Sequence, residues 1–477
     1  MSKRLNELTI AEARSMLDAG DVSSVEITKA CLAEAQSLNG ALNAYLETFD
    51  ESALDSARMS DERRAAKERL GLLDGIPLAM KDNILIQGKH ATAGSNILAG
   101  YVAPYDATVT TKLKSEGSVF LGRANMDEFA MGSSTEKSAY GPTRHHLDNE
   151  RVPGGSSGGS AVAVSANMSL ASLGSDTGGS IRQPAAFCGI VGLKPTYGRV
   201  SRSGLIAMAS SLDQIGPLTK TVEDAALMLQ AIQGQDKMDQ TTSNAPAFVP
   251  AWKENLTGVR VGLPRQAWGE GMDQGVRDRV TEAVKKLEEL GATIVEVDLP
   301  YVDEALAVYY VLMPCEVSAN LSRFDGIRFG RREPGLGLHE TYTRSRAEGL
   351  GAEVRRRIML GTYALSRGYY EAYYLQAKKV QTLIRRAYDA AFREVDVLLT
   401  PTAPTTAFKL GEKTKDPLAM YLEDIFTVGS NVAGLPAISV PCGHSDGLPV
   451  GLHLTGRSFD EATLLAIARV YEESSRV

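Results

Sequence analysis

PGGSSGGSAVAVSANMSLASLGSDTGGSIRQPAAFCGIVGLKP occupies residues 153–195, and its first 28 positions hold seven glycines and eight serines. Glycine tolerates positive φ and lets a ligand or another stretch of backbone approach closely. Two glycine-rich turns stand on either side of the apolar run 161–164, and the segment then continues into the apolar sequence AAFCGIVGLKP. This pattern predicts two small loops gathered around a bound ligand.

The residues on both sides of this segment predict an α/β fold. Short apolar runs bounded by Gly and Pro are typical of buried strands, and runs with helical periodicity alternate with them. The predicted strands are residues 76–80, 119–122, 259–263, 293–299 and 395–399, and the predicted helices are residues 222–233, 274–290, 351–391 and 461–473. Such alternation favours a mixed central sheet that helices cover on both faces.

The first 65 residues predict helices. Thr9 with Glu12, and Ser23 with Glu26, have the Ser/Thr-x-x-Glu spacing of a capping box, followed by apolar residues at helical intervals. We therefore expect residues 1–65 to form a helical layer packed on a core of residues 66–477. The polar stretch 235–250 is expected to be a surface linker or a loop within one domain.

Length, charge and cysteine spacing exclude several classes of protein. The chain has 477 residues, 43% of them apolar, and its 51 Lys and Arg against 58 Asp and Glu give a net charge of −7. This composition lacks the excess of Lys and Arg that a chain needs to bind nucleic acid by itself. The four cysteines stand more than a hundred residues apart, which excludes a disulfide scaffold or a zinc ribbon. No apolar run has the length of a signal peptide core or a membrane span, so we expect a cytoplasmic protein without membrane contact.

Several chemistries could use the Gly/Ser segment. A flexible linker is disfavoured because linkers rarely continue into an apolar run. Phosphate binding at a helix N-terminus would need the order GxxxxGK[ST] or GxGxxG, and neither occurs in the segment. Residues 154–158 spell GxSxG, but the polar sequence before them is not the strand that a nucleophile elbow needs. None of the six histidines has a motif relation to the serines, yet a Ser-His-Asp site assembles in space and stays open.

Lys81 is the other candidate base for a serine nucleophile. It follows the apolar run 76–80, so the predicted strand carries it to the rim of the sheet or into the core. Burial there would disfavour the ammonium and lower the pKa of Lys81, as a base near pH 7 requires. A lysine that reaches from a strand end to solvent is an equally common arrangement. Periodicity alone leaves the two open.

Three matches, in order along the chain, resemble the amidase signature family: Lys81 in GIPLAMKDN, Ser156 in PGGSSGGSA and Ser180 in GSDTGGSIRQPAAFCG. Members of that family hydrolyse amides with a Ser-Ser-Lys triad, in a large α/β/α domain around a mixed sheet. The resemblance implies that Ser180 is the nucleophile and that Lys81 is the base that draws its proton through Ser156. It also implies a cis peptide bond before Ser156.

The resemblance extends to residues around the two loops. The backbone N–H groups of Thr177, Gly178 and Gly179, continuing to Ser180, match an oxyanion hole. Fixed donors of this kind oppose the negative charge that develops on a carbonyl oxygen, and each contributes about 3 kcal/mol. Two further residues are implied as supports that orient the loops, Asp176 and Arg182.

Four other stretches resemble the branch of the family whose members are glutaminases of tRNA-dependent amidotransferases: residues 125–136, 324–330, 353–366 and 431–443. This branch implies that glutamine is attacked by Ser180 and leaves a glutamyl-enzyme. The released ammonia then passes to a partner that amidates glutamate or aspartate carried on tRNA.

Glutamine carries both an ammonium and a carboxylate, so its pocket should offer opposite charges. By resemblance, Arg357 is expected to bind the carboxylate and Asp424 the ammonium. Tyr309, or its neighbour Tyr310, is expected to line the pocket. Ser133 stands on the pocket wall where many relatives have a second glycine.

The branch also implies a division of labour between chains. This chain is expected to need no cofactor or metal, whereas ATP and Mg²⁺ act on a partner subunit. Two further subunits are expected in a heterotrimer, and charged tRNA is expected to be held mainly by the partner. The alternatives are a stand-alone small-molecule amidase with the same triad and a catalytically silent scaffold.

Overall fold

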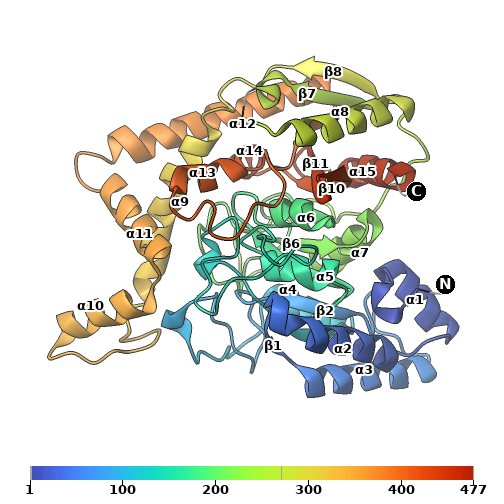
Figure 1. The fold of residues 1–477 in the computed structure, drawn as a ribbon, viewed down its shortest axis with the longest axis horizontal. Helices are drawn as coiled ribbons and strands as arrows, with labels where there is room; N and C mark the ends of the chain where they lie inside the picture. Colours follow the sequence, from blue (N-terminus) through green and yellow to red (C-terminus); the bar gives the residue numbers. More distant parts are fainter. Residues whose placement is uncertain (1–2, 270, 476–477) are drawn as a thin grey trace.

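The structure is a computed structural model that describes residues 3–269 and 271–475. Within these residues, eleven strands form one sheet in the order β1-β3-β2-β4-β6-β5-β10-β11-β9-β7-β8 (Figure 1). The strands are β1 Tyr45–Thr48, β2 Pro77–Lys81, β3 Val119–Ala124, β4 Ala171–Asp176, β5 Val191–Lys194, β6 Gln214–Thr219, β7 Arg260–Pro264, β8 Thr293–Val297, β9 Val397–Pro401, β10 Ala437–Ser445 and β11 Leu448–Gly456. The five strands predicted from sequence are therefore confirmed, to within a few residues at their ends.

The sheet is mixed. Strand β2 runs parallel to β3 and β4, and β7 runs parallel to β8 and β9. The other pairings, β1 with β3 and the central run β4-β6-β5-β10-β11-β9, are antiparallel. The predicted α/β class with a mixed central sheet is confirmed.

Helices cover both faces of the sheet. They are α1 Ile10–Ala19, α2 Ser24–Leu42, α3 Asp50–Ala65, α4 Thr108–Ser115, α5 Gly158–Ser165, α6 Arg182–Cys188, α7 Val222–Ile232, α8 Gln274–Glu289, α9 Ala305–Asn320, α10 Leu338–Gly349, α11 Ala352–Ala364, α12 Gln376–Glu394, α13 Pro417–Tyr421, α14 Val428–Ala433 and α15 Glu461–Ser475. On β11, a Cβ at Gly451 would meet Ala186 of α6, and one at Gly456 would meet Leu464 of α15. These glycines are five positions apart on the strand, an odd number, so they face opposite sides and place α6 and α15 on opposite faces.

The first 65 residues contain the two predicted capping boxes, at the starts of α1 and α2. Besides their helices they supply β1, which pairs antiparallel with β3 at one edge of the sheet. The division into a layer, 1–65, and a core, 66–477, stays a prediction, and the terminal residues 1–2 and 476–477 lie outside the described ones.

The single helix predicted over residues 351–391 is wrong. The chain leaves α11 after Ala364, turns through Gly368 at a φ of +90°, and resumes in a short π-helix, Glu371–Leu375, ahead of α12. A residue with positive φ cannot continue a right-handed helix, and glycine adopts it without strain. The break lets α11 and α12 both pack against α9.

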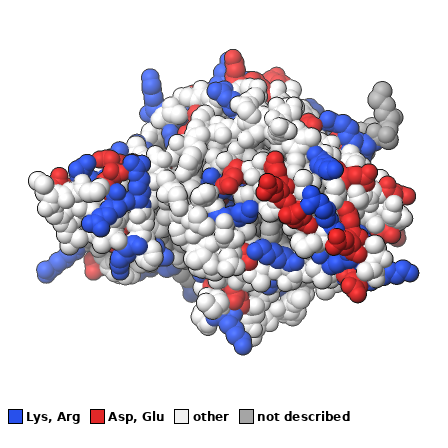
Figure 2. Space-filling model, turned by 90° about the horizontal axis from the view of Figure 1, so that it is seen from below, with Lys and Arg blue, Asp and Glu red and all other residues white. Residues whose placement is uncertain are grey.

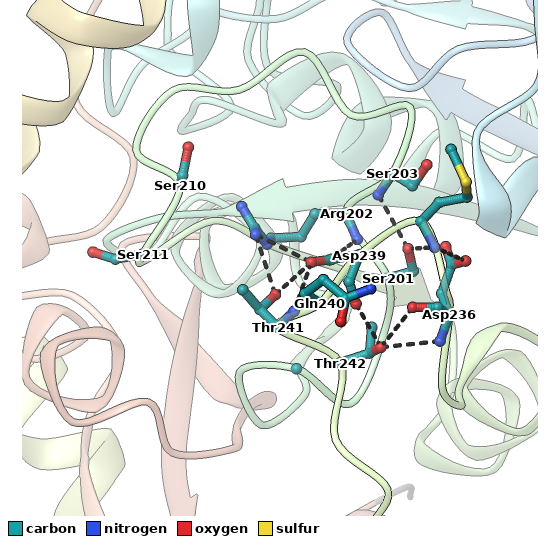
Figure 3. Close-up of polar contacts among 12 residues, drawn as sticks. Ser201, Arg202, Ser203, Ser210, Ser211, Asp236, Asp239, Gln240, Thr241 and Thr242 are labelled. Carbon is teal, nitrogen blue, oxygen red and sulfur yellow. Dashed lines mark hydrogen bonds and ion pairs between the residues drawn. The ribbon is translucent and has the colours of Figure 1, made fainter.

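The polar stretch 235–250 is a loop fixed to the body of the protein (Figure 3). Asp236 accepts a hydrogen bond of 2.6 Å from the Ser201 hydroxyl, and Asp239 accepts one of 2.8 Å from the backbone N–H of Arg202. The Thr241 hydroxyl lies 2.7 Å from the carboxylate of Asp239. Because it is anchored on Ser201 and Arg202, this stretch is a loop rather than a linker.

Residues 323–393 form a lobe that carries α10 and α11 on the left of Figure 1, together with α12, which runs from the upper left across the top of the molecule toward β7. It holds fifteen Lys and Arg against seven Asp and Glu, although the whole chain is acidic. Basic side chains gather on the part of the lobe seen at the left of Figure 2. Among the described residues, no helix combines the length and the apolar character needed to cross a membrane.

Candidate active site

Lys81 is the last residue of β2, and its side chain is fully buried. Its Nζ lies 2.8 Å from the Ser156 Oγ, 2.8 Å from the Ser157 Oγ and 3.0 Å from the Ser175 Oγ. Burial lowers the pKa of Lys81 to about 7, although Asp127 and other buried carboxylates oppose the shift. Of the two arrangements left open by the sequence, the structure has the buried one.

The first glycine-rich turn holds Ser156 and Ser157 at the start of α5. The peptide bond between Gly155 and Ser156 is cis, as the family resemblance implied. The Gly155 N–H donates to the side-chain oxygen of Gln183 at 2.9 Å, and the Ser157 N–H donates to the Ser180 carbonyl at 3.2 Å. These two bonds hold the first turn against the second.

The second glycine-rich turn joins β4 to α6 and carries Ser180, whose exposed fraction is 8%. The Thr177 hydroxyl donates to Asp213 at 2.8 Å, and Asp213 also accepts from the backbone N–H groups of residues 208 and 209. Gly179 has a φ of +149°, and a Cβ there would lie 2.3 Å from the Thr427 hydroxyl. The Thr427 hydroxyl in turn donates to the Gly178 carbonyl at 2.7 Å. The turn is therefore held from both sides by residues outside it.

Asp176 and Arg182 form a fully buried ion pair beneath this turn. Arg182 donates two parallel hydrogen bonds to Asp176, of 3.0 Å from Nε and 2.9 Å from Nη2. Burial raises the pKa of Asp176 and Arg182 lowers it, and the net result lies well below the usual range. Arg182 also donates to the Ser430 hydroxyl and the Asn431 amide oxygen. Because the charges of Arg182 and Asp176 are paired and fully hydrogen-bonded, the pair holds the start of α6 in place.

His453 completes the Arg182 network. Its Nε2 lies 2.9 Å from Arg182 Nη1, which can only donate, so Nε2 accepts and the proton sits on Nδ1. Nδ1 in turn lies 3.1 Å from the Thr400 hydroxyl. Burial and the charge of Arg182 hold the pKa of His453 well below its usual value. Both ring nitrogens are engaged, so His453 is not the base for a Ser-His-Asp site.

Arg357 lies on the inner side of α11 and is 3% exposed, whereas Arg355 and Arg356 are exposed. Its guanidinium lies 5.5 Å from the Tyr310 ring centroid and 5.4 Å from that of Tyr421. Burial alone would lower the pKa of Arg357, but the neighbouring tyrosines and Glu353 hold it above its usual value. Of the three consecutive arginines, Arg357 is the one that faces the interior.

Glu353 and Tyr421 keep the Arg357 guanidinium in place. Arg357 Nε donates to Glu353 at 2.8 Å, and the Tyr421 hydroxyl donates to the same carboxylate oxygen at 2.9 Å. The Tyr421 ring stacks on Tyr310 with centroids 4.0 Å apart. Arg357, Glu353 and Tyr421 border a narrow cavity of about 20 Å³.

Asp424 stands near the Ser180 turn. A Cβ on Gly179 would lie 3.4 Å from its carboxylate, and the Ser133 hydroxyl donates to that carboxylate at 2.8 Å. Burial raises the pKa of Asp424 to about 8, and the bond from Ser133 and the charge of Arg357 oppose this rise. Tyr309 is 3% exposed, and its ring would touch a Cβ on Gly178 at 2.8 Å. Ser133, Tyr309 and Asp424 therefore lie together beside the glycine-rich turn.

One group of side chains has the composition of a metal site. The ligand atoms of His145, His146 and Cys188 lie within 4.8 Å of one another. His145 Nε2, however, lies 2.8 Å from the Phe187 carbonyl, and His145 Nδ1 accepts from the Leu147 N–H at 3.1 Å. A metal would have to displace one of these bonds, so we interpret the group as packing between α5 and α6.

Several residues of the site were missed in the sequence. Ser175 contacts Lys81, and Asp213 contacts Thr177 of the second turn. Glu353 and Tyr421 contact Arg357. Ser157 was visible beside Ser156 in GGSSGG, and its bond to Lys81 could have been anticipated there. Ser175 likewise stands beside Asp176 in GSDTGGS, whereas Asp213, Glu353 and Tyr421 have no local signal, because each meets its partner only in the folded chain.

The comparisons with known proteins match nearly the whole chain. The family model described as Amidase matches residues 26–465. A protein of Moorella thermoacetica, named as a subunit of glutamyl-tRNA(Gln) amidotransferase, is 54% identical over 470 residues, which are 98% of this chain and 96% of that one. A protein of the same name from Chloroflexus aggregans is 54% identical over the same shares.

Solved structures agree with the sequence comparisons. The crystal structure of the corresponding glutamyl-tRNA(Gln) amidotransferase subunit from Thermotoga maritima superposes with a TM-score of 0.81 at 44% identity, covering 100% of this chain and 96% of that one. The peptide amidase from Stenotrophomonas maltophilia superposes with a TM-score of 0.83 at 30% identity, covering 99% and 97%. The fold is thus shared with amide-hydrolysing enzymes, and the higher identities are to amidotransferase subunits.

Proposed function

This chain belongs to the amidase signature family, and from this we propose that it is the glutamine-hydrolysing subunit of a tRNA-dependent amidotransferase. The observation that carries the proposal is the 54% identity, over 98% of the chain, to a protein named as a subunit of such an enzyme. The buried cluster of Lys81 with Ser156, beside the Ser180 turn, supports it chemically.

In the proposed reaction, Ser180 attacks the side-chain carbonyl of glutamine. Neutral Lys81 accepts a proton from Ser156, which takes one from the Ser180 hydroxyl as its oxygen bonds to the carbon. A lysine with a pKa of about 7 is neutral in about half of the molecules at neutral pH, so it can act as this base. The C–N bond then breaks, the proton is returned to the leaving nitrogen, and ammonia departs. Water hydrolyses the glutamyl ester on Ser180 by the same path in reverse.

The turn between β4 and α6 is proposed to stabilise the tetrahedral intermediates. The backbone N–H groups of Thr177, Gly178 and Gly179 are the proposed donors to the oxyanion, each worth about 3 kcal/mol. Asp176 and Arg182 act on this turn indirectly, because their buried pair fixes its far end. A rigid turn pre-organises its donors before the charge develops.

The substrate is proposed to lie between Arg357 and Asp424. Arg357 would bind the α-carboxylate of glutamine, and Asp424, whose pKa of about 8 keeps it mostly protonated in the empty site at neutral pH, would lose its proton as it binds the α-ammonium. Ser133 would orient Asp424 through its hydroxyl, and Tyr309 would form a wall beside Gly178. Two opposite charges at fixed positions select a free amino acid over a neutral amide.

The remaining steps are proposed for other chains. ATP and Mg²⁺ would activate the carboxylate of glutamate, or aspartate, carried on tRNA at a partner subunit, and this chain would supply only ammonia. The tRNA would be held mainly by that partner, in a complex with two further subunits.

Glutamate release from glutamine tests the proposal, measured with the chain alone and then with its partner subunits and charged tRNA. The full assembly should release glutamate and amidate the tRNA, and Ser180→Ala should do neither with glutamine as donor. A chain that cleaves small apolar amides but leaves glutamine intact in every mixture would be a stand-alone amidase, and the proposal would be wrong.

A further inference from the structure

The outer side of α11 and the turn after it expose an unusual amount of apolar surface. Seven large apolar side chains are exposed within residues 359–373, which lie along the left edge of the molecule in Figure 1. Single exposed apolar residues are ordinary, but a contiguous group on a protein surface marks a contact with another molecule. Nothing in the proposed chemistry uses these side chains.

The side chains form one continuous surface, which we call the tyrosine face: Met359, Leu360, Tyr363, Tyr369 and Tyr373. The Tyr363 ring centroid lies 4.4 Å from that of Tyr369 and 6.2 Å from that of Tyr373. Met359 and Leu360 precede Tyr363 by four and three residues on the helix, so they are its neighbours on that surface. Met359 is 72% exposed, and the other four are between 40% and 48% exposed.

The tyrosine face and the proposed glutamine site share one helix. The buried positions of α11 are Val354, Arg357, Gly361 and Ala364, and this inner side packs on α9. Met359 and Tyr363 lie on the opposite side, by the 100° turn per residue of an α-helix. A molecule on the tyrosine face would therefore stand about one helix diameter, roughly 10 Å, from Arg357.

We propose that the tyrosine face is the docking surface for the protein subunit that receives the ammonia. This inference rests on the proposed function, because it assigns a position to the partner that the function requires. The cavity beside Arg357 and Tyr421 is also lined by Arg356, which is exposed three residues before Met359 on α11, so a subunit seated on the tyrosine face would adjoin the mouth of that cavity.

The composition of the face fits a protein partner. Tyrosine and methionine are enriched at the centres of protein interfaces, with arginine, and charged side chains lie mostly at the rim. The exposed Arg355 and Arg356 lie one helical turn before Met359, and the exposed Arg367 lies in the turn after α11, so the partner's matching rim is expected to be acidic.

Other occupants fit less well. The five side chains of the tyrosine face are uncharged, so a phosphate backbone laid on the face would meet basic side chains only at its rim. A second copy of this chain, joined by a two-fold axis, would bring the same basic rim against itself.

The test is the double variant Tyr363→Arg/Tyr369→Arg, with Tyr105→Arg as the matched control. Tyr105 is also an exposed tyrosine, at 51%, and it lies outside α11. Binding of each purified chain to the tRNA-amidating subunit from the same source is measured by calorimetry. The double variant should bind at least tenfold more weakly than wild type, whereas the control should bind as wild type does. Glutamate release by the isolated chain should be unchanged in both variants, because none of these residues contacts the proposed triad or substrate.

The outcomes separate the two proposals. If wild type binds the tRNA-amidating partner and hydrolyses glutamine, and the double variant binds equally well, the docking surface is wrong and the proposed function stands. If wild type neither binds that partner nor releases glutamate with it, the proposed function fails. Loss in the double variant of a dimer of the chain alone, seen by sedimentation, would assign the face to a second copy. Loss of tRNA binding by the chain alone would assign it to RNA, and either result overturns the inference.

Discussion

Among single residues, Lys81 gives the most direct prediction about catalysis, because its pKa of about 7 makes the activity depend on pH. The lowered pKa means that Lys81 is protonated below pH 7 and neutral above it. The value of kcat for glutamate release should therefore rise with pH through about 7 and then level off. Saturating glutamine keeps Asp424 paired with the substrate, so that kcat reports on Lys81. A kcat that stays constant from pH 6 to 9 would contradict the assigned base.

Replacing Lys81 gives a complementary prediction. Lys81→Ala should lower glutamate release by several orders of magnitude, since neither serine then has a base within hydrogen-bond reach. Ammonium supplied to the assembled complex should still support amidation of tRNA, because it bypasses this chain's chemistry. Failure of this rescue would show that the division of labour between subunits is wrong.

Arg357 is predicted to act on binding. Arg357→Ala should raise the KM for glutamine by about ten- to a hundredfold, because a charge-assisted contact to a carboxylate is worth about 1.5–3 kcal/mol. Arg355→Ala is the matched control, since Arg355 lies two residues earlier on α11 and is exposed. Steady-state kinetics of both variants checks the assignment. An unchanged KM for Arg357→Ala would remove the residue from the substrate pocket.

Among the helices, α9 and α11 approach closely at one glycine. A Cβ on Gly361 would lie 1.8 Å from the Pro314 carbonyl oxygen, so Gly361→Ala must push the helices apart. We expect a loss of about 1–3 kcal/mol of unfolding free energy, and a raised KM because Arg357 lies one turn earlier on α11. Gly337→Ala, with open space around its Cβ, should cost much less. Denaturant titrations and kinetics would test both. Equal stability in the two variants would contradict this packing.

Five of the eleven strands in the described residues, and several helices, could be predicted from sequence because each has a local signal, whereas β1, β4, β5, β6, β10 and β11 were not predicted. The apolar runs between Gly and Pro became β2, β3, β7, β8 and β9, and two capping boxes became the starts of α1 and α2. The break after Ala364 was missed, since the residues on both sides of it continue the helical composition. The loop 235–250 was left open, because its anchors are side chains met only in the fold.

The residues of the candidate site also fall into two groups, those with a local sequence signal and those without one. Lys81, Ser156 and Ser180 stand in short motifs and could be located from sequence. Glu353 and Tyr421 could not, because they are 68 residues apart and share a partner only after α11 packs beside α13. Residues that position others leave no pattern of their own in one sequence.

For the molecule as a whole, charge is distributed unevenly. Residues 323–393 carry a net charge of +8, so the rest of the chain carries −15. We expect the isolated chain to bind charged tRNA weakly, because the rest of the chain has a net negative charge that repels the phosphates and only residues 323–393 have a net excess of basic residues. A fluorescence titration at physiological salt, with and without the partner subunit, checks this. Tight and salt-sensitive binding by the chain alone would contradict it.

The hydrogen bonds of Arg182 also predict at which stage of its synthesis on the ribosome the chain can form the candidate site. Arg182 is buried, and apart from Asp176 its partners are Thr427, Ser430, Asn431 and His453, which are translated about 245 to 271 residues later. A nascent chain that ends at residue 425 already contains all three residues of the proposed triad but lacks these anchors. Such a chain, stalled on the ribosome, should release no glutamate from glutamine. On this prediction, no glutamine is hydrolysed by a subunit whose synthesis is incomplete.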